Sequence, residues 1–197
     1  MTFPGIPILF ILFITFLVIY NYKMAKVSKE IDKSNDQFIE RERKADFTRK
    51  KPLDDIKFVK PNINIMSSIS QDDIDDDLYN KIILCKENYE KVANLKMAFF
   101  RNKTNTDLKL QYGAANLNTL INFESTYNNL LSIIIKWAKL LIEANKEKEA
   151  IILLEEGIRL ESDFEANYTL LIDLYEKSNE ISKLKNLKEI IRHRKKI

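Results

Sequence analysis

The sequence predicts an all-α protein in which an N-terminal transmembrane helix is followed by a domain of helical hairpins. Residues 3–20 form an almost wholly apolar run without a charged side chain. After Pro61 the chain contains no proline and two of its three glycines, which favours helices because sheets need more turn-forming residues. Apolar residues then recur at helical spacing, most clearly over residues 126–145, which contain the single tryptophan.

The N-terminal apolar run is long enough to cross a bilayer, whose hydrocarbon core needs about 20 such residues. An uncleaved anchor over residues 1–22 is preferred to a signal peptide, because no lysine or arginine precedes residues 3–20 and no clear small-residue cleavage site follows them. Tyr20 and Tyr22 fit the aromatic belt at a membrane surface. Positive charge begins at Lys23, so the positive-inside rule predicts a single-pass cell-membrane protein with its N-terminus outside and its C-terminal domain in the cytoplasm.

Residues 23–69 are predicted to be a charged juxtamembrane stalk or linker. They have few apolar anchors, which is typical of a solvated helix or a mobile stalk. Their lysines and arginines offer a contact with anionic lipid, but the interspersed acids favour a solvated linker. Between Pro52 and Pro61, an extended segment containing Ile56 and Phe58 is expected to lie against the following domain.

Residues 70–197 are predicted to form the all-α domain. Ser70 is expected to cap its first helix, because acidic residues follow it and negative charge stabilises a helix start. A calcium loop is disfavoured, since the glycine and the final glutamate of an EF-hand are missing. The apolar stripe from Leu78 to Phe99 includes Cys85, which is expected to pack in the core and not to act as a nucleophile.

A short helix is expected between this stripe and the long helix that carries the tryptophan. Thr106 with Asp107 indicates its cap, and Gly113 indicates its end. Asn116 or Asn118 is expected to begin the long helix.

Much of the pattern of the tryptophan-bearing helix returns about 34 residues further along the chain. This period, with aromatic and small residues at matching places, resembles the tetratricopeptide repeat. The resemblance implies units at about 131–164 and 165–197, in which small residues let antiparallel helices approach and large residues fill the groove beside them. The residues expected in this repeat core are Trp137, Ala138, Leu141, Ala150, Leu154, Leu171 and Tyr175.

The match to the repeat is partial. Leu141 stands where tyrosine is usual, Leu154 where phenylalanine is usual, and Ser162 where a closing proline is usual. Asn145 and Asn179 occupy equivalent turn positions, where a left-handed backbone is expected because asparagine tolerates it. A generic bundle of helical hairpins, with a chance offset, is the alternative.

The chain also resembles an uncharacterised family of small bacterial single-span membrane proteins with C-terminal tetratricopeptide-like repeats. The phrase NTDLKLQYGAANL, at residues 105–117, carries this resemblance. It implies a membrane-anchored repeat protein and no particular activity.

The first functional hypothesis is a scaffold that binds an unidentified protein partner, as a peptide or a helix, at the cytoplasmic face of the membrane. Tyr127, Asn128 and Tyr168 are the candidate partner contacts, although each taken alone is better explained as a core tyrosine or a solvated asparagine. A homo-oligomer is also compatible with the short repeat array.

The second hypothesis is an enzyme, which the sequence disfavours. It has no glycine-rich phosphate loop, no HExxH or GxSxG motif, and no His, Cys and Asp at ligand spacing. We therefore predict no catalytic residue, no metal and no cofactor.

The third hypothesis is that a basic C-terminal surface binds anionic lipid or an acidic partner. Basic residues near a helix C-terminus also complement the helix dipole, which is the alternative explanation. Nucleic acid is disfavoured, because no aromatic residues for base stacking are interleaved. The residues of this candidate basic surface are Lys183, Arg192, Arg194, Lys195 and Lys196.

Overall fold

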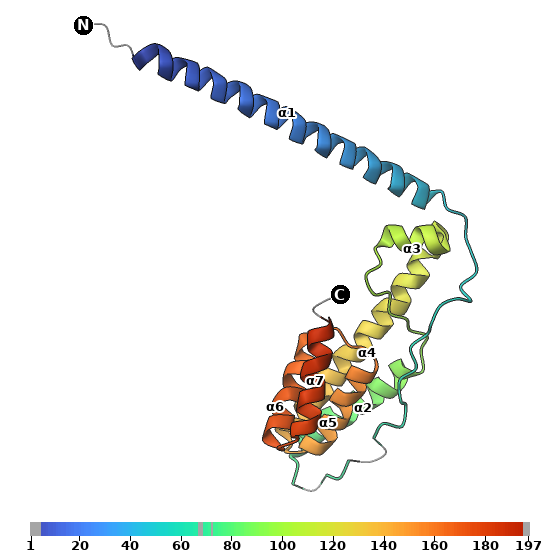
Figure 1. The fold of residues 1–197 in the computed structure, drawn as a ribbon. Coiled ribbons are helices and arrows are strands. Elements are labelled where there is room, and N and C mark those ends of the chain that lie inside the picture. The colour runs from blue at the N-terminus through green and yellow to red at the C-terminus, as the bar shows by residue number, and fades with distance from the viewer. Residues whose placement is uncertain (1–4, 67–68, 72, 195–197) are drawn as a thin grey trace. The chain divides into compact units, whose positions relative to one another are not determined.

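The computed structural model describes residues 5–66, 69–71 and 73–194, and within these ranges every regular element is a helix (Figure 1). The elements are α1 (Gly5–Asp46), α2 (Asp76–Ala93), α3 (Asn105–Tyr112), the 3-10 turn η1 (Ala114–Asn116), α4 (Leu117–Glu143), α5 (Glu147–Arg159), α6 (Glu165–Lys177) and α7 (Ile181–Arg194). The only β-type pairing among the described residues is an isolated antiparallel bridge between Phe58 and Ala98. The predicted all-α class is therefore confirmed.

The chain divides into two compact units. Unit 1 combines Met1–Pro52 with Lys103–Leu117, and unit 2 combines Leu53–Asn102 with Asn118–Ile197. Each unit is described separately below.

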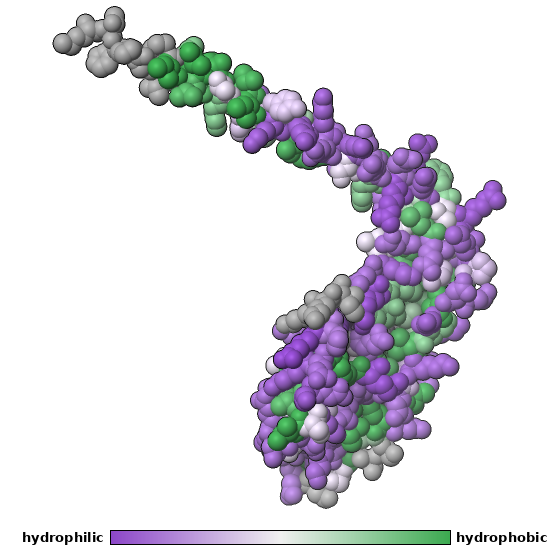
Figure 2. Space-filling view, in the orientation of Figure 1, coloured by the Kyte–Doolittle hydropathy of each residue, from purple (hydrophilic) through white to green (hydrophobic). Residues whose placement is uncertain are grey.

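The main element of unit 1 is α1, which continues without a break past residue 22. The predicted stalk is thus helical up to Asp46, so of the two expectations for this part, a solvated helix or a mobile stalk, the structure has a helix. Apolar side chains gather over the N-terminal part of α1 and polar ones over the rest (Figure 2). Among the described helices, α1 alone is long and apolar enough to cross a membrane by length and composition.

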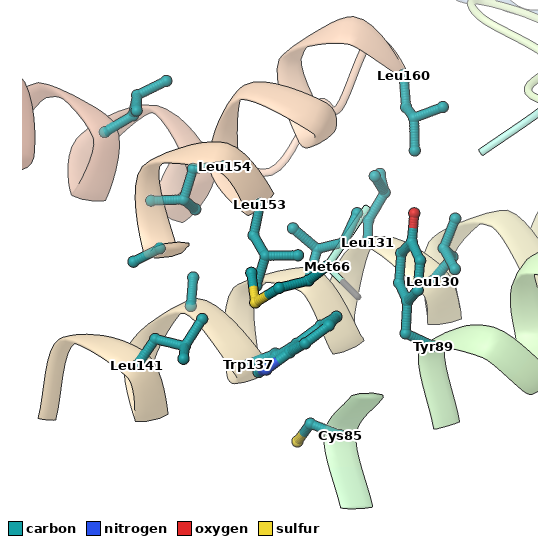
Figure 3. Packing of buried hydrophobic residues seen from close by; sticks show 14 of the residues in the cluster. Met66, Cys85, Tyr89, Leu130, Leu131, Trp137, Leu141, Leu153, Leu154 and Leu160 are labelled. Carbon is teal, nitrogen blue, oxygen red and sulfur yellow. The ribbon is translucent and has the colours of Figure 1, made fainter. Parts of the chain in front are cut away.

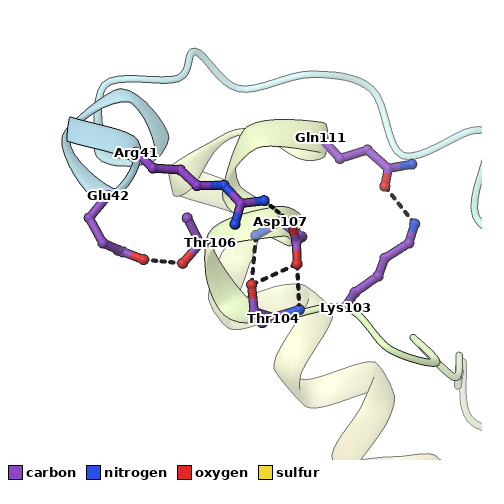
Figure 4. Close-up of polar contacts among 7 residues, drawn as sticks. All are labelled: Arg41, Glu42, Lys103, Thr104, Thr106, Asp107 and Gln111. Carbon is purple, nitrogen blue, oxygen red and sulfur yellow. Dashed lines mark hydrogen bonds and ion pairs between the residues drawn. The ribbon is translucent and has the colours of Figure 1, made fainter. Parts of the chain in front are cut away.

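The short helix α3 packs on the C-terminal end of α1, and its cap differs from the prediction. Thr104, and not Thr106, is the N-cap: its hydroxyl accepts from the backbone N–H of Asp107, while the Asp107 carboxylate accepts from the Thr104 backbone. The Thr104 hydroxyl also donates to the Asp107 carboxylate (2.7 Å), and this bond, followed by the one from the Thr104 backbone, lowers the pKa of Asp107. Thr106 faces α1 instead, and its hydroxyl donates to the Glu42 carboxylate (Figure 4).

Three ion pairs also tie α3 to α1. The Arg41 guanidinium lies 2.6 Å from the Asp107 carboxylate, and the Lys109 ammonium lies 2.7 Å from Asp46 and 3.3 Å from Glu42. Arg41 and Asp46 are exposed, so their pairs orient α3 more than they stabilise it, whereas the pair of Lys109 with Glu42 is partly buried.

Gly113 ends α3, as predicted, because only glycine fits this position. Its φ of 91° lies in a region that L-residues avoid. A Cβ there would lie 2.3 Å from the backbone oxygen of Arg49. On either side of this close approach, the Lys51 N–H donates to the Tyr112 carbonyl (3.0 Å) and the Ala114 N–H donates to the Thr48 carbonyl (3.2 Å). The phrase at 105–117 thus forms a backbone junction within unit 1.

Unit 2 begins with an extended segment that lies against the domain, as predicted. The Val59 N–H donates to the Met97 carbonyl (2.9 Å), and the Phe58 ring meets Phe123 edge-on at 5.3 Å between centroids. Ile56 is buried.

The first helix of unit 2 starts later than predicted. Asp75 is the N-cap of α2, because its carboxylate accepts from the N–H groups of Asp77 and Leu78. The predicted cap Ser70 lies outside the helix, and Asp73 adopts a left-handed conformation that is incompatible with a helix running through it. Phe99, predicted on the same helix, lies beyond its end at Ala93.

The core of unit 2 is built around Trp137, whose side chain is fully buried (Figure 3). Tyr89 of α2 lies 5.8 Å from it between ring centroids, and Leu153 of α5 and Met66 lie over the indole. Cys85 is buried in the same cluster, and this burial raises the pKa of its thiol. The remaining residues of the predicted repeat core are also buried: Ala138, Leu141, Ala150, Leu154, Leu171 and Tyr175.

The turns between the C-terminal helices follow the prediction. Asn145 and Asn179 have φ values of 55° and 57° and separate α4 from α5 and α6 from α7. Helix α5 packs closely on α6 at Gly157, where a Cβ would lie 2.3 Å from the Asn167 side chain. The amide of Asn167 donates to the Leu154 carbonyl at 3.0 Å, so it links the two helices.

Candidate interaction surface

A predominantly apolar groove of about 340 Å³ lies between α5, α6 and α7 of unit 2, and we call it the Tyr175 groove. We call its aliphatic lining residues, Ile158 of α5, Leu171 of α6 and Leu187 and Ile190 of α7, the floor of the groove. We call its polar and charged lining residues the rim. The groove is lined by Glu155, Ile158, Arg159, Leu171, Tyr175, Lys183, Asn186, Leu187 and Ile190.

On one side of this groove, Glu155 joins the side chains of two helices. Its carboxylate accepts a hydrogen bond from the Tyr175 hydroxyl (2.7 Å) and forms an ion pair with Lys183 (2.9 Å). The Lys183 ammonium also lies 5.7 Å from the centre of the Tyr175 ring. Burial, and then the neighbouring Glu155 carboxylate, raise the pKa of Tyr175, so the phenol stays neutral and donates.

On the other side, Arg159 is also paired. Its guanidinium makes two hydrogen bonds of 2.6 Å to the carboxylate of Glu156, which is buried. The Asn62 N–H donates to the same carboxylate (2.8 Å), and Arg159 donates to the Lys60 carbonyl (3.0 Å). Both basic side chains of the groove therefore have acidic partners, which leaves a nearly neutral groove with an aliphatic floor.

A second, more polar cleft lies around Arg194 at the end of α7. Two hollows of about 310 and 490 Å³ share Asp163 and Arg194 in their lining. The Arg194 guanidinium donates to the Ser162 carbonyl and to the Tyr168 hydroxyl, and it lies 4.8 Å from the centre of the Tyr168 ring. Its charge is thus engaged within unit 2, and the cleft carries both acidic and basic groups.

The structure corrects the predicted partner contacts. Tyr127 and Tyr168 are buried, and their hydroxyls donate to the Leu160 carbonyl (2.9 Å) and the Ser162 carbonyl (2.7 Å). They hold the α5–α6 turn in place and are not exposed to a partner, because buried hydroxyls need an internal acceptor. Asn128 is half-buried on α4 and lines neither cleft.

The structure also divides the predicted basic surface. Lys183 and Arg194 have partners within unit 2, as described above, whereas Arg192 is exposed on α7. Lys195 and Lys196 lie outside the described residues. The described part of this surface therefore presents less unpaired charge than the sequence indicates.

Three aliphatic residues that line the Tyr175 groove, Leu187 and Ile190 on α7 and Ile158 on α5, were not predicted as contacts. Leu187 and Ile190 lie three residues apart, a helical spacing that places them on one face of α7.

Within residues 5–66, 69–71 and 73–194, no group of three His, Cys, Asp or Glu side chains is placed to hold a metal ion. Comparisons of the chain with models of protein families, with curated proteins and with solved structures find no match.

Proposed function

We propose that this protein is a membrane-anchored helical scaffold whose unit 2 binds an apolar segment of a partner protein in the Tyr175 groove. The observation that carries the proposal is the chemistry of that groove. Its aliphatic floor favours apolar side chains, because transferring them out of water is favourable. Its rim charges are already paired, so a charged ligand gains little there.

A groove of about 340 Å³ lies at the lower end of the volumes typical of ligand pockets, so it suits one or two inserted side chains. This favours a peptide or helix that inserts an anchor residue and rests the rest of its length on the surrounding helices. We expect leucine, isoleucine, methionine or phenylalanine at the anchor position.

The anchoring part of the proposal is supported by the apolar N-terminal part of α1, which no other described residue covers. About 20 apolar residues suffice to span a bilayer. Since the first lysines follow this segment, we place the N-terminus outside and unit 2 in the cytoplasm. A reporter fused after Ile197 tests the orientation: activity on the outer side of the membrane contradicts it.

The partner is tested by site-specific photo-crosslinking in cells. A photoreactive amino acid at Asn186, which lines the groove and is exposed, is compared with one at Lys185, its exposed neighbour outside the lining. We expect a discrete crosslinked protein from position 186 and not from 185. Ile190→Trp, which fills the groove and leaves position 186 free for the photoreactive amino acid, should lower the yield at 186 at least about tenfold because the anchor is displaced.

Equal crosslinking at the two positions, or products that contain only this chain, would contradict a groove that binds another protein.

A further inference from the structure

The helix α1 carries a continuous stripe of exposed apolar side chains that extends into its charged half. Within the helix these positions alternate in steps of three and four residues, which is the spacing of the a and d positions of a coiled coil. Every residue of the stripe is apolar except one serine. The stripe consists of Phe10, Phe13, Leu17, Tyr20, Met24, Val27, Ile31, Ser34 and Phe38.

Charge is excluded from the stripe and from one of its flanks. Between residues 20 and 38, the positions next to the stripe on that flank are Asn21, Ser28 and Asn35, which are uncharged. Every lysine, aspartate and glutamate of that part of α1 falls on the other positions. A solvated helix has no need of such a segregation, whereas a helix that packs along one face requires it.

The apolar side chains of the stripe are exposed to solvent beyond the membrane-spanning part of α1. Val27, Ile31 and Phe38 expose 48%, 53% and 62% of their surface. Unit 1 covers only the end of the same row, where α3 buries Ala45 and Arg41 pairs with Asp107. A helix that extends some 20 residues beyond a bilayer is marginal in water unless its apolar face is packed.

We propose that the α1 helices of two copies of this chain pair in parallel and in register along this stripe. The inference rests on the proposed membrane anchoring, because one bilayer sets two copies side by side with the same orientation and at the same height. That arrangement brings each a or d position opposite its own counterpart. An antiparallel pair is excluded for chains anchored with one orientation.

The flanking residues are compatible with this pairing. In a parallel pair, position g of one helix faces position e of the other, five residues further on. Lys23 then meets Ser28, and Glu30 meets Asn35. The next such contact joins Gln37 to residue 42, a glutamate that Lys109 and Thr106 already engage. Each of these three contacts therefore includes a neutral side chain, so no like charges oppose each other across the pair.

The test is disulfide crosslinking of the full-length protein in membranes. Single cysteines replace Val27 or Ser34 on the stripe, and Lys29 or Asp36 on the opposite face, in a Cys85→Ala background. Two facing cysteines can form a disulfide only when their Cα atoms lie within about 7 Å. We expect covalent dimers from V27C and S34C, and at least about tenfold fewer from K29C and D36C, because the latter pairs lie beyond this reach.

A second variant separates pairing from chance collision. Ile31→Glu buries two like charges in the stripe and should lower the V27C dimer yield at least about tenfold, whereas Lys33→Glu on the solvated face should leave it unchanged. The melting of unit 2 serves as the folding control.

Equal yields from both faces, no dimers, or a product whose mass shows a different protein would overturn pairing with a second copy. Recovery of the protein in the soluble fraction would overturn the anchoring instead. The comparison of V27C with K29C, repeated on that soluble protein, would still decide the pairing.

Discussion

Replacing Gly113 by alanine tests the backbone junction that joins the 105–117 phrase to the end of α1. The backbone at this residue has φ 91° and ψ 144°, which an L-residue adopts only under strain. The added Cβ would also lie 2.3 Å from the Arg49 oxygen and 2.7 Å from the Lys50 Cα. Both neighbours are backbone atoms, so no side-chain rotation relieves the contact.

The size of the effect follows from two contributions. The strained backbone costs about 1–3 kcal/mol. Opening the junction also forfeits the hydrogen bonds from Lys51 to Tyr112 and from Ala114 to Thr48, each worth about 0.5–1.5 kcal/mol. The two contributions are not additive, because opening the junction also relieves the backbone strain. We therefore expect G113A to lower the local free energy of opening by about 2–4 kcal/mol, which raises the exchange rate roughly 30- to 700-fold.

Hydrogen–deuterium exchange on the full-length protein in detergent measures this directly. The amides of Lys51 and Ala114 should lose protection, while those of α5 and α6 provide the reference within the same molecule. Ala115→Gly is the matched control, because Ala115 is exposed and the change costs at most about 1 kcal/mol. Exchange in G113A no faster than in A115G at these two amides would show that the junction does not depend on glycine.

Three further predictions concern unit 2. Trp137→Ala should lower the free energy of unfolding, measured by chemical denaturation, by about 3–5 kcal/mol. Ile181→Ala, at an exposed site, should change it by less than about 0.5 kcal/mol. An unchanged denaturation midpoint for W137A would contradict the burial of the indole in the core. Gly157→Ala should cost about 1–3 kcal/mol through its clash with Asn167. A variant as stable as the wild type would mean that the Asn167 side chain moves aside without cost. Burial raises the pKa of Tyr127, so the unfolded state, whose tyrosines ionise near pH 10, loses this proton first: stability should be full below about pH 10 and fall above it. Tyr127→Phe should reduce the slope of the free energy of unfolding against pH above pH 10 by about one proton. Denaturation followed by tyrosinate absorbance measures this slope, and an unchanged slope would contradict the raised pKa of Tyr127.

Several local features followed from the sequence because they depend on short-range chemistry. An uncharged run of apolar residues whose prolines lie only at its beginning has few alternatives to a long helix, which α1 confirms. Gly113, Asn145 and Asn179 were expected at chain reversals because their backbone freedom is local. Trp137 was expected in the core because it lies on the apolar face of its helix.

The errors arose where several residues competed for the same role. Ser70 and Asp75 are both good N-caps, and the left-handed Asp73 decides between them. Thr104 and Thr106 are two residues apart, and Asp107, three residues after Thr104, favours Thr104 as the cap because it completes a capping box. The contact of Thr106 with Glu42 depends instead on the position of α1.

Composition and helical period were enough to establish the all-α class, one N-terminal helix apolar enough to cross a membrane, and the residues that must be buried. Which polar groups remain available depends instead on how the helices pack. Tyr127 and Tyr168 have hydroxyls that suit a binding surface, yet internal carbonyls accept from both. Lys183 belongs to a basic run in the sequence, but Glu155 from another helix pairs with it. The partner of a polar side chain lies far along the chain, and packing alone brings the two together.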